Sequence, residues 1–159
     1  NPQRIVSHRF YRVTANEESS EVLCALLNAS TTSLSSEILA GASLGEGVHD
    51  ISGITIRMVP VLNTLKLSNY TRQALSSAFV KLRSREIRSV FEEVGLPKPN
   101  KHYSNIRPED VSLDKVLPDR RELDRVVFEA IGLTEGEQLE VYQAVVELVK
   151  NRLVKAGSV

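Results

Sequence analysis

The spacing of apolar residues changes once along this chain, and this change constrains the fold more than any other feature of the sequence. Before Val61 the apolar residues form short runs on both alternating faces, as Ile5, Val6 and Phe10 do. After Ser68 they recur at helical spacing. The first pattern is typical of strands covered on both sides, and the second of amphipathic helices. We therefore expect a mixed α/β (α+β) fold, in which a small β-sheet with a packed helix precedes a long helix and a C-terminal helical pair.

The expected elements divide the chain into four parts. Strands at 5–13 and 55–61 enclose a helix at about 21–40. A long helix follows at 68–94, and its apolar stripe shifts phase at Glu86, as happens when a long helix changes its packing partner. The expected parts are a sheet-bearing module at 1–66, the long helix at 67–95, a proline-containing linker at 96–118 and a helical pair at 119–159.

Capping residues place the two C-terminal helices. Asp119 follows a proline and is expected to cap the first of them. Thr134 and Glu137 have the spacing of a capping box, which predicts that the last helix covers about 135–155.

The net charge of zero, from 20 basic and 20 acidic residues, hides a local excess of bases. Residues 1–12 contain no acid, and residues 51–91 hold seven bases against a single glutamate. Such an excess favours phosphate contacts, because each neutralised phosphate releases condensed counterions. A solvated helix face is the alternative interpretation. The basic residues that would form a phosphate-contacting surface are Arg4, His8, Arg9, Arg12 and Arg57, although the charge alone does not point to DNA.

Gly45 and Gly47 frame a tight turn. These glycines either supply positive φ in a hairpin-like turn or let the backbone approach a DNA phosphate. A dinucleotide-binding loop is excluded, because the turn lacks a third glycine and follows an expected helix instead of a strand.

The sequence offers little metal or thiol chemistry. His8, His49 and His102 lack metal-ligand spacing, and one cysteine cannot build a zinc site. Cys24 lies among apolar residues of an expected helix, so we expect a buried, inert thiol. No apolar run approaches the roughly 20 residues of a membrane span, and the start has no signal-peptide pattern. We expect a protein of the reducing cytoplasm with no membrane partner, cut from a longer chain.

Two stretches carry more specific phrases. The first comprises Ser7-His8-Arg9-Phe10-Tyr11-Arg12-Val13, Leu26-Leu27-Asn28-Ala29-Ser30, Gly45-x-Gly47-Val48 and Val59-Pro60-Val61. The second comprises Leu117-Pro118-Asp119-Arg120-Arg121-Glu122-Leu123-Asp124 and Phe128-Glu129-Ala130-Ile131-Gly132-Leu133. Together they cover most of the chain and resemble the target recognition region and C-terminal tail of gamma-class N6-adenine DNA methyltransferases of restriction-modification systems. The second stretch is the more specific, and Asn28-Ala29-Ser30 departs from the Asn-Ser usual in the family.

The resemblance implies that 1–66 is a partial target-recognition module, with the DNA-contacting residues named above joined by Gly45 and Gly47. It also implies two partners, double-stranded DNA and the catalytic domain of the parent enzyme, which would bind S-adenosylmethionine. The family's Asn-Pro-Pro-aromatic motif is unmatched, because Gln3 follows Asn1-Pro2. We therefore expect neither methyl transfer nor cofactor binding by this chain. The alternative function is a helical interaction module, such as a subunit-contact part of a restriction complex that reads no bases.

Overall fold

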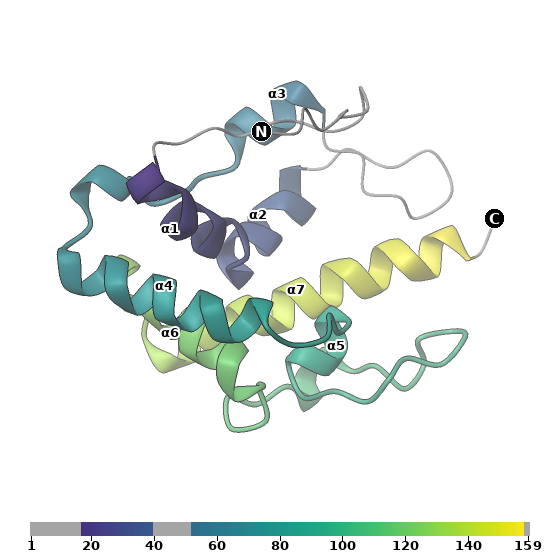
Figure 1. The fold of residues 1–159 in the computed structure, drawn as a ribbon. Coiled ribbons are helices and arrows are strands. Elements are labelled where there is room, and N and C mark those ends of the chain that lie inside the picture. The colour runs from purple at the N-terminus through teal and green to yellow at the C-terminus, as the bar shows by residue number, and fades with distance from the viewer. Residues whose placement is uncertain (1–16, 40–51, 158–159) are drawn as a thin grey trace.

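The structure is a computed structural model that describes residues 17–39 and 52–157. Within these two ranges every regular element is helical and no strand occurs (Figure 1). In chain order the elements are α1 (Glu17–Leu27), α2 (Ser30–Leu39), α3 (Gly53–Met58), η1 (Thr64–Lys66), α4 (Asn69–Arg83), α5 (Val90–Glu93), η2 (Pro108–Asp110), α6 (Pro118–Ile131) and α7 (Glu135–Ala156).

The expected α/β fold with a small β-sheet is wrong, because the segment expected to form the second strand is helical. Ser52 accepts a hydrogen bond from the amide of Thr55 at 3.1 Å and so caps α3. Ile54 and Met58 contribute to a strand-like alternation in the sequence, but both are exposed on this helix. The described ranges also contain no strand with which such a segment could pair. The other expected strand, at 5–13, lies outside the described residues.

The helix expected at 21–40 is two helices, α1 and α2, that meet at an angle of 62°. The Asn28 side chain donates to the carbonyl of Cys24 at 2.9 Å, near the end of α1. The amide of Ser30 donates to the carboxylate of Asp124 on α6, at 2.8 Å, instead of continuing α1. Ser and Thr, which are weak helix formers, make up most of α2. The bend therefore follows from a contact with a distant part of the chain.

Cys24 is exposed on α1, so the expectation of a buried thiol is wrong. The inward face of this region is formed by Val22, Ala25, Leu26 and Ala29. The cysteine follows Val22 by two residues, which on a helix places it well around from that face.

The long helix expected at 68–94 is also interrupted. α4 ends at Arg83, and residues 84–89 form a non-helical link to α5. Ser89 and Glu92 form a capping box that restarts the helix. The phase shift at Glu86 therefore marks a break between two helices, and the expected continuous helix with a new packing partner is wrong.

Two clusters of buried apolar residues hold the helices together, and α6 takes part in both. Helix α4 packs against α6, α2 against α7, and α1 against α4 (Figure 1). One cluster, between α1, α4 and α6, includes Leu26, Leu75 and Leu123. The other includes Phe128 of α6 and Tyr142 of α7, whose rings meet edge to face with centroids 5.6 Å apart.

The segment expected to be a linker, 96–118, is ordered by contact. Ile106, Val111 and Val116 are buried in the second cluster, and the short helix η2 lies between them. The proline-rich composition therefore produces a structured loop that lies against α5 and α7.

Helices α6 and α7 occupy the ranges expected for the C-terminal pair. Thr134 and Glu137 form the expected capping box, and Gly132 ends α6 with a left-handed φ of 77°. Asp119 differs from expectation: the cap position belongs to Leu117, and Asp119 lies in the first turn behind Pro118.

No single helix in the described ranges has both the length and the hydropathy of a membrane span. Helices α1 and α2 have the length and hydropathy of a span only when they are counted together, and they are bent by 62° at their junction.

Candidate functional site

The structure places one of the residues expected to contact DNA. Arg57 lies exposed in the last turn of α3. The others, Arg4, His8, Arg9, Arg12, Gly45 and Gly47, lie outside the described residues. The expected grouping of Arg57 with the N-terminal arginines therefore stays a prediction.

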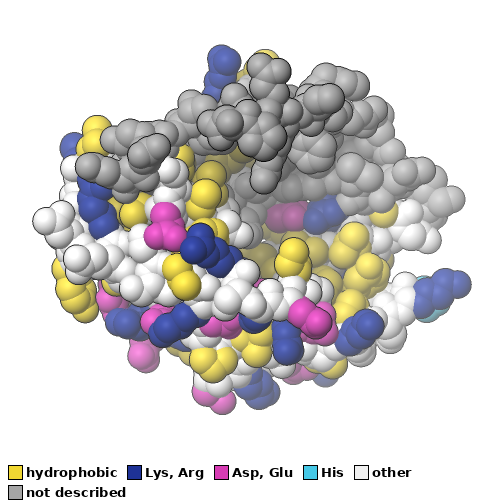
Figure 2. Space-filling view, in the orientation of Figure 1, with side chains coloured by type: hydrophobic (Ala, Val, Ile, Leu, Met, Phe, Trp, Pro, Cys, Tyr) yellow, Lys and Arg dark blue, Asp and Glu magenta, His cyan; other side chains and the backbone are white. Residues whose placement is uncertain are grey.

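Several bases of the 51–91 segment are bound to acids from other parts of the fold. Lys81 lies 2.8 Å from Glu122, and Arg83 lies 3.2 Å from Glu21. Figure 2 shows basic and acidic side chains interleaved along the face that α4 presents. The charge excess seen in the sequence therefore does not form a continuous basic field over α4.

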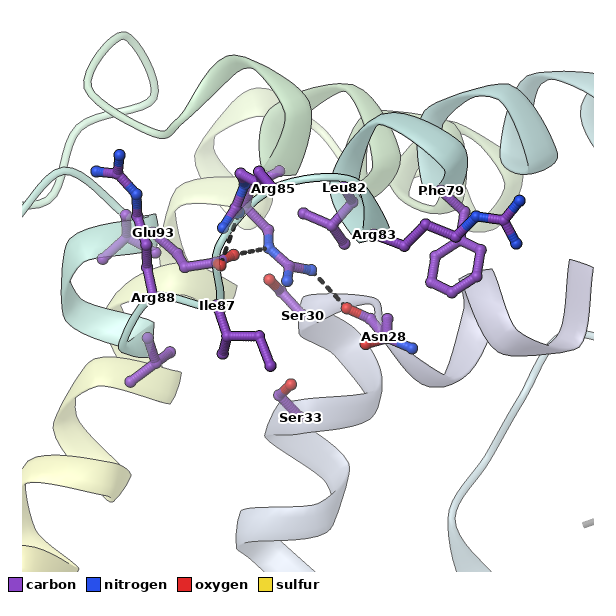
Figure 3. Close-up of a pocket in the computed structure, with 13 residues that line it drawn as sticks. Asn28, Ser30, Ser33, Phe79, Leu82, Arg83, Arg85, Ile87, Arg88 and Glu93 are labelled. Atoms are coloured by element: carbon purple, nitrogen blue, oxygen red, sulfur yellow. Dashed lines mark hydrogen bonds and ion pairs between the residues drawn. The ribbon is translucent and has the colours of Figure 1, made fainter. Parts of the chain in front are cut away.

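A denser set of ion pairs surrounds Glu93, a buried acid on α5. Each of its two carboxylate oxygens forms an ion pair with one arginine, with Arg85 Nη2 at 2.7 Å and with Arg120 Nε at 2.5 Å. Arg85 also pairs with Asp119, and Arg120 Nη1 donates to the carbonyl of Asn28 at 2.5 Å. Figure 3 shows Arg85 and Glu93 near Asn28, between the link 84–89, α5 and the junction of α1 with α2. We call this set the arginine network.

Asp124 lies one turn beyond Arg120 on α6 and extends the arginine network, because its carboxylate is 3.8 Å from the Arg120 guanidinium. Its carboxylate is fully buried and accepts hydrogen bonds from the amide and hydroxyl of Ser30 and from the Tyr142 hydroxyl, at 2.8, 2.7 and 3.0 Å. Burial raises the pKa of Asp124, against the opposing effects of Arg120 and these donated hydrogen bonds. Burial, together with the neighbouring Asp124 carboxylate, also raises the pKa of Tyr142.

A cavity of about 430 Å³ opens above the arginine network. Phe79, Leu82 and Val90 give it an apolar wall. Four arginines also line it: Arg83, Arg88 and the two arginines of the network, Arg85 and Arg120. Figure 3 shows Ile87 on the link facing Ser30 and Ser33 of α2 across this space. The Ile87 side chain is 99% exposed, which is unusual for a large apolar residue.

The lining of this cavity combines apolar groups, four arginines, one glutamate, one asparagine and two serines, and it includes neither histidine nor cysteine. The Ser30 hydroxyl is already committed to the buried Asp124. Among the described residues, no group of three or more His, Cys, Asp or Glu side chains is placed to hold a metal ion.

The arginine network lies outside the site residues expected from the sequence. The resemblance marks 117–124, which contains Arg120, as part of a C-terminal tail and not as a binding site. Arg120 lies 3.8 Å from Asp124, but its other partners, Glu93 and Asn28, were not expected, nor was the contribution of Arg85. These residues lie on separate segments of the chain, and no local pattern connects them to 118–124.

Comparisons with known proteins add no relative: no family model, no curated protein and no solved structure matches this chain.

Proposed function

We propose that this chain is the DNA-recognition and C-terminal region of a site-specific adenine-N6 DNA methyltransferase of a restriction-modification system, and that it is non-catalytic by itself. Its partners would be double-stranded DNA and the catalytic domain of the parent enzyme. That domain would bind S-adenosylmethionine, and the enzyme would act in the cytoplasm.

The supporting observation is the use that the fold makes of segment 118–124. Each of its charged side chains contacts a different part of the chain. The pairs are Asp119 with Arg85, Arg120 with Glu93, Arg121 with Gln138, Glu122 with Lys81, and Asp124 with Ser30 and Tyr142. We therefore give the resemblance at this segment more weight than the resemblance in the first stretch, where 59–61 follow the helix α3 instead of ending a strand.

The link to DNA comes from that resemblance and from exposed bases that remain on the surface. Arg57, Lys66 and Arg88 are all exposed, on α3, η1 and the link before α5. Duplex binding through such residues is electrostatic, so the logarithm of the binding constant should fall linearly with the logarithm of the salt concentration.

Fluorescence anisotropy of a labelled duplex, titrated with the full chain at about 50 and about 200 mM salt, tests the proposal. We expect binding at the lower salt that weakens at the higher. Isothermal calorimetry with S-adenosylmethionine should give no binding heat, and stoichiometric cofactor binding would contradict the non-catalytic assignment. A chain that ignores DNA at low salt would remove the DNA-recognition role.

A second candidate function, a protein-interaction module, is favoured by Ile87 and the cavity beside it. A fully exposed isoleucine next to an apolar wall flanked by arginines suits a partner that offers apolar and acidic side chains. Ile87→Ser should then weaken assembly with the parent's catalytic domain while leaving duplex binding unchanged.

A further inference from the structure

The loop between α5 and η2 contains bases and no acids. From Val94 to Pro108 the chain carries Lys98, Lys101, His102 and Arg107 without a single Asp or Glu. In Figure 1 this segment projects from the helical body below α7, and in Figure 2 basic side chains and a histidine meet at the same edge of the molecule. We call residues 97–105 the basic loop.

The basic loop is held in one shape by its own asparagines. The Asn100 carboxamide oxygen accepts hydrogen bonds from the amides of His102 and Ser104, both at 3.1 Å. The Asn105 side-chain oxygen accepts a hydrogen bond from the Asn100 backbone amide at 2.9 Å, and its side-chain nitrogen donates to the carbonyl of Lys98 at 2.9 Å. These bonds tie the two ends of the loop to each other and fix the backbone that carries the lysines.

The second half of the loop is also anchored to the core. Tyr103 has a left-handed φ of 56°, and its ring lies 6.0 Å from that of Phe91. Ile106 is fully buried, and its carbonyl accepts a hydrogen bond from Lys150 Nζ on α7 at 2.6 Å. A non-glycine residue keeps positive φ only where its surroundings hold it there, so this conformation belongs to an ordered loop.

The cations at the loop surface form no ion pair within the described residues. Lys98, Lys101 and His102 are exposed, and no acidic side chain of the described ranges lies within salt-bridge distance of any of them. Hydrogen bonds from Ser89 lower the pKa of Glu92 on α5, and the charge of Lys98 adds to this effect. Arg107, just after the loop, behaves differently and pairs with Glu109 at 2.9 Å. The loop therefore presents a net positive charge on a backbone that is already ordered.

This combination suits a repeating anion better than a single small one. Lys101 and His102 line one side of an open hollow of about 620 Å³ whose other side is the end of α7, and Lys98 is not part of its lining. The cations of the loop therefore do not converge on one enclosed site. Their charge can meet successive phosphates, which lie along a duplex at one charge per about 1.7 Å of helix axis. An anionic membrane fits less well, because Leu96 and Ile106 are buried and Val154, exposed at the end of α7 beside the loop, offers a single aliphatic side chain for insertion into lipid.

We propose that the basic loop docks on the phosphate backbone of duplex DNA, with Lys98 and Lys101 as the main contacts and His102 beside them. This inference rests on the proposed function and extends it, because it places a DNA contact in the acidic C-terminal half of the chain. The contacts would fix the position of the protein on the duplex without reading its sequence.

The test compares Lys98→Gln/Lys101→Gln with the control Arg107→Gln/Arg125→Gln in the full chain. Both variants remove the same net charge, but the control arginines are already paired with Glu109 and Glu129. Anisotropy titrations of a duplex of about 20 base pairs across salt concentrations should show a roughly tenfold loss of affinity for the loop variant and a salt slope smaller by about two. The control should lose less than about twofold by the same measure. Circular dichroism checks that both variants keep the wild-type helix content.

The outcomes separate the two proposals. If the wild-type chain binds DNA and both variants bind equally well, the loop docking is wrong and the proposed function stands. If the wild-type chain does not bind DNA, both fall. A loop variant that loses binding to phosphatidylserine vesicles, with duplex binding unchanged, would assign the loop to a membrane surface and overturn the inference.

Discussion

Ser30 and Asp124 join two distant parts of the chain through a double hydrogen bond, in which the amide and the hydroxyl of Ser30 both donate to the buried carboxylate, at 2.8 and 2.7 Å. The first residue of α2 is thus fixed to the second turn of α6. Tyr142 of α7 donates to the same carboxylate at 3.0 Å. One side chain therefore sets the relative positions of three helices.

Removal of the Asp124 carboxylate should destabilise the protein strongly, because three buried donors would lose their acceptor. We expect Asp124→Ala to lower the free energy of unfolding by about 3 to 5 kcal/mol. Asp124→Asn keeps the shape and one acceptor and should cost about 1 to 2 kcal/mol. Urea denaturation followed by circular dichroism measures both. Equal losses for Ala and Asn would show that the carboxylate is not a shared acceptor.

Gly95 should be far less replaceable than Gly132, although both have positive φ, 79° and 77°. An alanine Cβ at Gly95 would lie 2.3 Å from the carbonyl oxygen of Lys115, whereas one at Gly132 would meet nothing within 4 Å. We expect Gly132→Ala to cost about 1 to 2 kcal/mol from backbone strain alone, and Gly95→Ala more than about 3 kcal/mol from strain plus the clash. Thermal melts of the two variants check the order. Similar melting temperatures would contradict the close approach.

Cys24 should react with a thiol reagent in the native protein, because its side chain is exposed on α1. The reaction with Ellman's reagent should proceed at a rate within about tenfold of that in denaturant, whereas a core thiol would wait for the protein to open and react slower by a factor on the order of a thousand. A native rate as slow as that would contradict the exposure of Cys24 and support the buried thiol expected from the sequence.

Local patterns predicted the elements whose causes are local. Thr134 and Glu137 begin α7 through contacts within one turn, so their spacing was sufficient to place it. The break at Asn28 depends on Asp124, and the break after Arg83 places Arg85 against Glu93 and Asp119. Such distant partners cannot be inferred from periodicity. The sequence analysis therefore predicted continuous helices at both places.

The false strand has a different origin. Ile56, Met58, Val59 and Val61 put apolar side chains on both alternating faces, which is the pattern of a strand covered on both sides. A short helix capped by Ser52 satisfies its own backbone groups, whereas a strand needs a neighbour to do so. The arginine network was not predicted for a similar reason: segment 118–124 stands out by itself in the sequence, but its partners lie on five other segments.

The ion pair between Arg85 and Glu93 should be stronger than the one between Lys81 and Glu122. The first pair has side chains 22% and 10% exposed, and the second 59% and 36%. In double-mutant cycles with glutamine at each position, we expect a coupling energy of about 1 to 3 kcal/mol for the first pair and below about 1 kcal/mol for the second. A larger coupling at the exposed pair would mean that the arginine network contributes little to the stability of the fold.

The acid dependence of stability should separate Asp119 from Asp124, because their pKa values are shifted in opposite directions. Partial burial raises the pKa of Asp119, but hydrogen bonds from Arg85 and from the Arg120 amide, with the charge of Arg85, together hold that pKa below its ordinary value of 3.8. Its contribution to stability is therefore fully present above that value and is lost as the pH falls through the folded pKa. For Asp124 the pKa is raised by burial, so its contribution is present below 3.8 and is lost as the pH rises through the folded pKa.

Urea denaturation of the wild type, Asp119→Asn and Asp124→Asn across the acid range tests these signs. The stability advantage of the wild type over Asp119→Asn should be constant above about pH 5 and shrink below about pH 4. The advantage over Asp124→Asn should instead shrink as the pH rises past about 4, because the wild type must then bury a charge. If the stability difference between the wild type and Asp119→Asn grew in acid, Arg85 would not stabilise the charged form of Asp119. The pair of Arg85 with Asp119 would then not belong to the arginine network.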